Sequence, residues 1–176
     1  MDLASHQRLC LGLIRGTHVV QPHDGPYYQR VATSTDLDVA RTNIALWRLY
    51  VLERTCVLTV ALLKRRELLM STLDAFVGSC NLSPFREFQP LAFLEFLHDH
   101  PDPLVASVSQ FELALTRVRD GDPDTYHVHW LRDPSAVLMA LAQNAPLEET
   151  ILDGSYTTRI SGDLPFLFEA SVALAT

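Results

Sequence analysis

The chain has 176 residues and a mass of 19.7 kDa, the size of one compact domain or of two small domains that share an interface. Hydrophobic residues make up 48% of it and charged residues 20%, which excludes a disordered chain and provides enough apolar side chains for a core. The formal net charge of −7 and the isoelectric point near 5.4 argue against a general nucleic-acid binder.

The charge is unevenly distributed along the chain. Residues 1–88 carry 10 basic and 8 acidic side chains, whereas residues 89–176 carry 4 basic and 13 acidic ones. Of the 14 basic residues only Lys64 is a lysine; arginine suits bidentate contacts at interfaces, and a GC-rich genome produces the same bias. No C-x-x-C pair occurs, so we expect reduced and mostly buried thiols at all three cysteines. These are Cys10, Cys56 and Cys80.

The hydropathy pattern gives no sign of a membrane segment. The longest apolar run, Cys56 to Leu63, has 8 residues, whereas a spanning helix needs about 20. The first residues lack a positive region followed by a long apolar stretch, so no secretory signal is visible. The sequence therefore predicts a cytoplasmic protein without a membrane anchor.

The first half of the chain predicts helices. Apolar residues at helical spacing predict a short amphipathic helix over Leu3 to Ile14, ended by Gly16. Turn-forming residues predict a long loop from Gly16 to Ser34. Residues 36–77 contain no Gly or Pro, and we expect one or two long helices there, with a turn at the basic cluster Lys64-Arg65-Arg66.

The next helices have clear start and stop signals. Pro90 opens a helix that should end before His98. Asp102 is placed to cap the following helix with Pro103 at its first position, and the turn-forming stretch 121–124 closes it.

After residue 124 the pattern changes to strands. Residues 126–130 are aromatic and β-branched without helical periodicity, which predicts a strand. Residues 134–142 could form a helix capped by Asp133 or a further strand. Residues 156–160 and 166–168, on either side of a turn, predict a hairpin. The sequence thus predicts an α+β protein, with a helical bundle over residues 1–121 and a small antiparallel-sheet domain over residues 122–176.

No complete catalytic or metal-binding motif is present. The chain lacks G-x-G-x-x-G, Walker, H-E-x-x-H and G-x-S-x-G patterns. His127 and His129 would share one face of a strand, but two histidines are an incomplete metal site and half-exposed imidazoles on a sheet are the commoner case. Glu95 and Glu112 lie on otherwise apolar helices, where ion pairing or a helix surface is commoner than acid–base catalysis. We therefore predict no catalytic residue and no metal ligand in this chain.

Four stretches occur in the order found in a known family. The first resembles the "Y-R-x-N-V" helix of a DNA-binding family with a helical N-terminal domain, and the others resemble its "F-x-x-F-L … L-A-x-L-E-W-A-L" signature. The stretches are Leu37–Ile44, Ser83-Pro84, Phe93–Leu97 and Val108–Leu115. Ala40 stands where the family has Tyr, and Leu113 stands where it often has Trp. The resemblance covers about residues 36–160.

Within that superfamily, small chains of this length resemble accessory subunits of multinuclear non-haem iron enzymes that modify ribosomally made peptides, such as the partners in 3-thiaglutamate and methanobactin biosynthesis. The resemblance implies a RiPP-recognition-like sheet domain and a tight heterodimer with an iron-binding TIM-barrel subunit. This chain would bind the leader of the precursor peptide, and the barrel would oxidise its cysteine, with β-carbon excision of a C-terminal Cys favoured and the methanobactin-type reaction second. The iron would lie in the partner, so no cofactor is expected in this chain.

An extended leader could add as a strand to an exposed sheet edge. The candidate edges are the two predicted strands at 126–130 and 156–160, whose surrounding carboxylates would suit a leader with basic residues. The candidate peptide-binding residues are Tyr126, His127, Val128, His129, Tyr156, Thr157, Thr158 and Arg159.

Two other functions stay open at this point. The first is a DNA-binding or regulatory module, as the related family's description suggests. The only dense basic cluster is Lys64-Arg65-Arg66, and three charges are few for such a role. The second is a free-standing metal hydrolase built on the histidine pairs, for which no third ligand is evident.

Overall fold

The computed structural model describes residues 2–79, 86–147 and 153–172. These residues form eight α-helices, two short 3-10 helices and one three-stranded antiparallel sheet, which confirms the predicted α+β class. The helices are α1 Leu3–Arg15, η1 Pro22–Asp24, α2 Pro26–Ala32, α3 Thr35–Thr55, α4 Val57–Arg65, α5 Leu69–Ser79, η2 Arg86–Phe88, α6 Gln89–Phe96, α7 Pro103–Arg119 and α8 Pro134–Ala142. The strands are β1 Tyr126–Arg132, β2 Asp153–Ile160 and β3 Phe168–Val172.

The chain divides into two compact units at places that the sequence did not indicate. Unit 1 comprises Met1–Val51 and Met70–Leu82, and unit 2 comprises Leu52–Leu69 and Ser83–Thr176. The boundary expected at residues 121–124 falls inside unit 2, because α7 packs against β1 and β2 rather than belonging to a separate helical bundle.

Unit 1 is built around a small apolar cluster. Leu13 of α1, Tyr28 of α2 and Leu37 of α3 are its buried members. Gly16 ends α1 as predicted, with the positive φ of 71° that favours glycine at this cap position. The guanidinium of Arg41 donates two hydrogen bonds to the Leu13 carbonyl, at 2.6 and 3.1 Å, which also accepts from the Gly16 N–H, so α3 is tied to the end of α1.

Two predictions for this half of the chain are wrong in detail. The expected loop at 16–34 contains η1 and α2, because Pro26 occupies the first helical position, where its fixed φ and missing N–H cost nothing. Residues 36–77 contain parts of three helices rather than one or two, since α3 ends at Thr55 and α4 begins at Val57. The turn expected at the basic cluster does occur, between α4 and α5.

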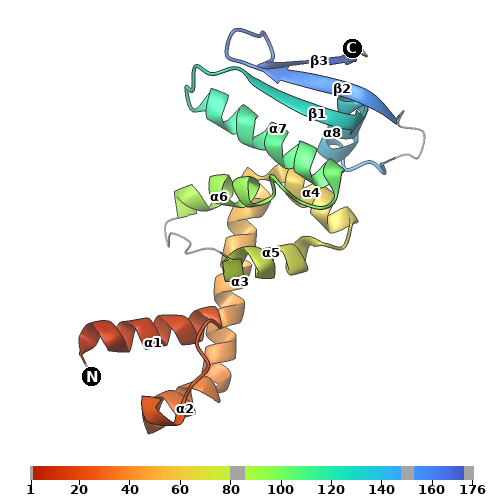
Figure 1. Ribbon diagram of the computed structural model, residues 1–176. Helices are drawn as coiled ribbons and strands as arrows, with labels where there is room; N and C mark the ends of the chain where they lie inside the picture. Colours follow the sequence, from red (N-terminus) through yellow and green to blue (C-terminus); the bar gives the residue numbers. More distant parts are fainter. Residues whose placement is uncertain (1, 80–85, 148–152, 173–176) are drawn as a thin grey trace. The chain divides into compact units, whose positions relative to one another are not determined.

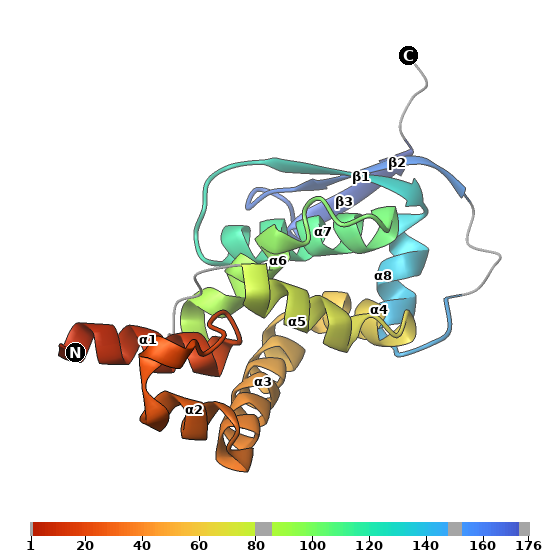
Figure 2. The same cartoon turned by 60° about the horizontal axis from the view of Figure 1, so that its bottom comes forward.

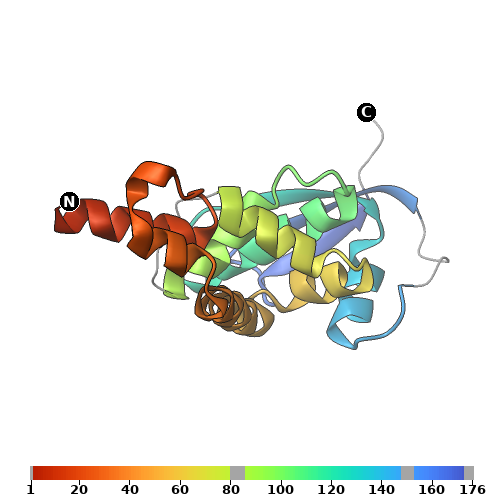
Figure 3. The same cartoon turned by 90° about the horizontal axis from the view of Figure 1, so that it is seen from below.

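Unit 2 places helices on one face of its sheet (Figure 2). Asp102 caps α7 as predicted, its Oδ1 accepting from the Leu104 N–H at 2.9 Å. Asp133 caps α8 in the same way through the Ser135 N–H, which settles residues 134–142 as a helix. Seen from the helical side, α4 and α8 lie next to each other in front of the strands (Figure 3).

The sheet has the strand order β1–β2–β3, so β2 is central and both neighbours pair with it antiparallel (Figure 1). In the register, Val128 lies opposite Thr158, and Thr158 lies opposite Ala170. Because side chains alternate between the two faces of a strand, this register defines one row facing the helices and one row facing away from them.

Candidate functional site

The face of the sheet that α7 covers is its core. Trp130 of β1 is 1% exposed, and its ring meets the ring of Phe111 of α7 edge to face. Trp130 also donates from Nε1 to the hydroxyl of Thr158 at 2.9 Å, a buried hydrogen bond between neighbouring strands. Val128 and Thr158, two of the predicted peptide-binding residues, are 3% and 0% exposed. Their side chains therefore hold the sheet together and are not accessible to a peptide.

The other face of the sheet carries polar side chains. His127, His129, Thr157 and Arg159 all lie on it, because they alternate with the buried residues of β1 and β2. The histidines are exposed, and Nδ1 of His129 lies 3.4 Å from the Thr157 hydroxyl. Arg159 contacts two exposed carboxylates, those of Asp163 at 2.8 Å and Glu169 at 3.3 Å. This face thus brings four of the predicted residues together on an uncovered surface.

The two remaining candidates, Tyr126 and Tyr156, lie on the helix side at half-buried positions. The Tyr126 hydroxyl donates to Asp122 at 2.6 Å, and this hydrogen bond raises the pKa of the tyrosine while lowering that of the carboxyl. The guanidinium of Arg117 lies 6.0 Å from the centre of the Tyr126 ring. Tyr126 is therefore engaged with the turn that precedes β1.

The backbone pairing shows which peptide groups point out of the sheet. Directly after β2, the Ser161 N–H donates to the carbonyl of Leu167, the residue before β3, at 2.9 Å, so this position is a hydrogen-bonded one in the register of the two strands. Because such pairs alternate along an antiparallel ladder, residues 157 and 159 also bond to β3, while residues 156, 158 and 160 bond to β1. It follows that His127 and His129 of β1, and Phe168, Ala170 and Val172 of β3, direct their N–H and C=O groups outward.

β2 is not a sheet edge. It pairs with β1 on one side and β3 on the other, so its backbone groups at Tyr156–Arg159 are used within the sheet. The expectation that residues 156–160 could receive a leader strand is therefore corrected. A strand can be added only beside β1 or beside β3.

The two true edges are not equally open. The Ser107 hydroxyl of α7 donates to the outward carbonyl of His129 at 2.8 Å, which occupies part of the β1 edge. Within the described ranges, no backbone hydrogen bond from another segment reaches the outward groups of Phe168, Ala170 or Val172. The β3 edge is thus the more available of the two.

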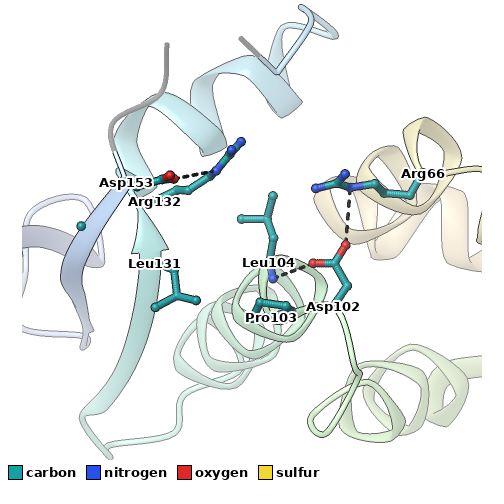
Figure 4. Close-up of a pocket in the computed structure, with 8 residues that line it drawn as sticks. Arg66, Asp102, Pro103, Leu104, Leu131, Arg132 and Asp153 are labelled. Atoms are coloured by element: carbon teal, nitrogen blue, oxygen red, sulfur yellow. Dashed lines mark hydrogen bonds and ion pairs between the residues drawn. The ribbon is translucent and has the colours of Figure 1, made fainter. Parts of the chain in front are cut away.

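A cleft of about 470 Å³ lies at one end of the sheet, between the end of β1 and the start of α7 (Figure 4). Its floor is apolar, formed by Pro103, Leu104 and Leu131. Two arginines line it, and each is held by a carboxylate. Arg66 Nε lies 3.4 Å from Asp102, and Arg132 Nε lies 3.1 Å from Asp153.

Two groups that could suggest catalysis have structural explanations. Glu112 of α7 is buried, and its two carboxylate oxygens accept from the N–H groups of Leu58 and Thr59 at 3.0 and 2.9 Å. It therefore caps α4 from another helix. Burial raises the pKa of Glu112, and the backbone N–H groups work against that rise. Burial, with Glu112 nearby, also raises the pKa of Cys56 to about 12, so this thiol is not a nucleophile at neutral pH.

The basic cluster is tied into unit 2. Lys64 Nζ lies 2.6 Å from Glu53, Arg65 donates to the Ala140 carbonyl at 3.0 Å, and Arg66 pairs with Asp102. Each of the three cations therefore contacts an acceptor of unit 2, and together they are few for a phosphate-binding patch. Of the other singled-out residues, Glu95 pairs with Arg117 at 2.6 Å, Cys10 is half-buried, and Cys80 lies outside the described residues.

The described residues contain no group of three or more His, Cys, Asp or Glu side chains that could hold a metal ion. Nor does any helix of that part of the chain have the length and apolar character needed to cross a membrane. Comparison with known proteins adds no relative, since no family model, curated protein or solved structure matches the chain.

Proposed function

We propose that this chain is a non-catalytic partner subunit that binds the leader of a ribosomally made peptide as an added strand beside β3. Its partner would be an iron-dependent TIM-barrel oxidase, to which it presents the cysteine of the peptide. The favoured reaction is 3-thiaglutamate-type excision of the β-carbon of a C-terminal Cys, and a methanobactin-type oxidation is the second choice. The partner and the reaction rest on the sequence resemblance, whereas the binding mode rests on the geometry of the sheet.

The observation that carries the binding mode is the open edge of β3. Phe168, Ala170 and Val172 offer a row of outward N–H and C=O groups, which is what an extended peptide needs for main-chain pairing. On the side facing away from the helices, Glu169 of β3 would lie beside the added strand. A basic side chain in the leader would suit that position.

The regulatory alternative receives no such support. A DNA-binding module needs a cluster of cations available to phosphates. The three cations of the Lys64-Arg65-Arg66 cluster are each held by an acceptor within unit 2.

A proline substitution tests the edge directly. The N–H of Ala170 points away from β2, so Ala170→Pro should leave the sheet intact while removing one donor from the open edge. We expect this variant to weaken leader binding at least about tenfold, because it loses a main-chain hydrogen bond and its ring obstructs the approaching strand. Isothermal titration calorimetry with the leader of the precursor peptide measures the effect.

Two matched variants make this test specific. His127→Pro removes an outward N–H from the opposite edge and should leave binding unchanged, and Ala170→Ser keeps the N–H and should also bind normally. Circular dichroism establishes that each variant is folded. Normal binding by a folded Ala170→Pro variant would refute the β3 site, and a loss confined to His127→Pro would place the peptide beside β1.

The partner is tested separately. Co-expression with the proposed barrel subunit should give a stoichiometric complex, and the chain alone should be poorly soluble, since obligate interfaces are as apolar as a core. A well-behaved monomer that shows no association with the barrel protein would refute the assignment as a partner subunit.

A further inference from the structure

The cleft at the end of the sheet contains two arginines whose hydrogen-bonding capacity is largely unused. Arg66 and Arg132 each engage a carboxylate through Nε. Among the residues that the structure describes, none accepts from their Nη atoms. A guanidinium held at Nε keeps its two outer nitrogens as a fork, which is the geometry that binds a planar oxyanion.

The two arginines line the same cleft. In Figure 4 the guanidinium of Arg66 reaches in from the end of α4 toward Leu104, and that of Arg132 lies on the other side of Leu104, at the end of β1. An anion bound between the two side chains would accept from the outer nitrogens of both. The volume of about 470 Å³ lies within the range of small-ligand sites.

The other lining residues restrict the charge and size of the anion. Asp102 and Asp153 balance the two arginines, so the cleft has no net charge and would disfavour a dianion such as phosphate. A monoanion matches the two forks better. The apolar floor at Pro103, Leu104 and Leu131 suits a ligand that also carries hydrocarbon next to its charged group.

We infer that this cleft binds a carboxylate of the peptide, either its C-terminus or an acidic side chain, with an apolar group of the peptide on Leu104 and Leu131. This inference rests on the proposed peptide-binding function. Leu131 and Gly154 line the cleft at the end of the sheet where β3 also ends, since Val172 pairs with Tyr156. The cleft would therefore hold one charged group of a peptide whose backbone pairs elsewhere.

Small probes test the cleft without the leader. N-acetylleucine carries a terminal carboxylate, the α-amide of N-acetylglutamate carries a side-chain carboxylate, and N-acetylleucinamide carries none. In nuclear magnetic resonance titrations of the full chain, we expect at least one carboxylate probe to bind with millimolar affinity and shift the Leu104 and Leu131 signals. The uncharged amide should bind at least about tenfold more weakly, since a charge-assisted hydrogen bond is lost. The tighter of the two carboxylate probes identifies the source of the carboxylate.

Conservative variants identify the residues. Arg66→Lys and Arg132→Lys keep the charge but lose the fork, and each should weaken the carboxylate probe about tenfold. Arg117→Lys is the matched control, because Arg117 also pairs with a carboxylate in unit 2 but does not line the cleft. Its affinity for the probe should not change.

Four outcomes would overturn the inference: equal binding of the uncharged amide, unchanged binding by both cleft variants, an equal loss in Arg117→Lys, or tighter binding of inorganic phosphate than of either carboxylate. The result is independent of the β3 test. Ala170→Pro should still bind the carboxylate probe, so failure of the cleft and failure of the edge site give different patterns.

Discussion

The two outer strands of the sheet are held in different ways. β1 is fixed from two directions, since Val128 and Trp130 are buried under α7 and the Ser107 hydroxyl bonds to the His129 carbonyl. β3 has one half-buried residue, Phe168, and the remaining four are exposed. It is attached through the ladder to β2, the contact of the Phe168 ring with Phe111, the ion pair of Glu169 with Arg159 and a hydrogen bond from the Ser171 hydroxyl to the Thr157 carbonyl.

The difference shows that one outer strand stabilises the core of unit 2, while the other is left able to pair with a further strand. β1 contributes the buried side chains that stabilise unit 2, and part of its outer edge is already used by α7. β3 contributes little burial and leaves its outer backbone groups open. A strand that carries little of the core can pair with another chain without any loss of packing inside the unit.

The largest expected effect tests the anchoring of β1. Trp130→Ala should lower the free energy of unfolding by about 3–5 kcal/mol, because it removes a buried ring and leaves the Thr158 hydroxyl without its donor. Val172→Ala on β3, where the side chain is 70% exposed, should change it by less than about 0.5 kcal/mol. Denaturant unfolding of both variants, followed by far-ultraviolet circular dichroism because Trp130 is lost as a fluorescent probe, measures the two free-energy changes. Equal losses would contradict the contrast between the strands.

The next effect concerns the helix that supports β1. Glu112→Ala should cost about 2 kcal/mol, because it leaves the N–H groups of Leu58 and Thr59 without acceptors. Thr116→Ala on the same helix removes a hydroxyl that bonds only within α7, to the Glu112 carbonyl at 2.8 Å, and should cost less. Urea unfolding compares the two, and a larger loss in Thr116→Ala would contradict the capping role.

The same residue gives unfolding a pH dependence. Burial raises the pKa of Glu112 in the folded chain above its ordinary value of 4.5, so folding favours the protonated form. Its contribution to stability is complete below pH 4.5 and is lost as the pH rises through the folded-state pKa. Glu112→Gln should remove this decline. Unfolding free energies of the unmodified chain and of Glu112→Gln between pH 4 and 7 test this decline. The same pH dependence in both proteins would contradict it.

The smallest effect probes the hydrogen bond that closes part of the β1 edge. Ser107→Ala should cost about 1 kcal/mol, since it removes the donor to the His129 carbonyl. Binding of the leader beside β3 should not change. Hydrogen exchange would show faster opening of β1 with β3 unaffected, and slower exchange at β1 would contradict the assignment.

The sequence predicted those elements whose signals are local. Asp102 with Pro103 marks a helix start that occurs as predicted, whereas Asp133 with Pro134 left a helix or a strand open, and the structure shows the helix. Gly25 and Pro26 were interpreted as a loop, although Pro also favours the first position of a helix, which is how α2 begins. The two compact units each join segments far apart in the chain, a grouping that no local signal in the sequence indicates.

The candidate site was predicted less well, for a related reason. The residues 126–130 and 156–160 do form strands, but strand order is set by pairing and not by local composition. β2 is therefore central, and the open edge lies at Phe168–Val172. The prediction of a strand at 166–168 is wrong in its bounds, because only Phe168 belongs to β3 and residues 166 and 167 lie in the turn before it. Arg66 and Arg132 are 66 positions apart in the chain, so no spacing pattern could have brought them into one cleft.

The capping of α4 by Glu112 has a consequence for the order of folding. α4 has 9 residues, too few for a stable isolated helix. The acceptors for its N–H groups at Leu58 and Thr59 come from Glu112, which lies 54 and 53 positions further along the chain. During synthesis, α4 should therefore remain only transiently helical until α7 has left the ribosome and docked. α7 would then act as the folding nucleus of unit 2, with α4 and β1 condensing on opposite sides of it.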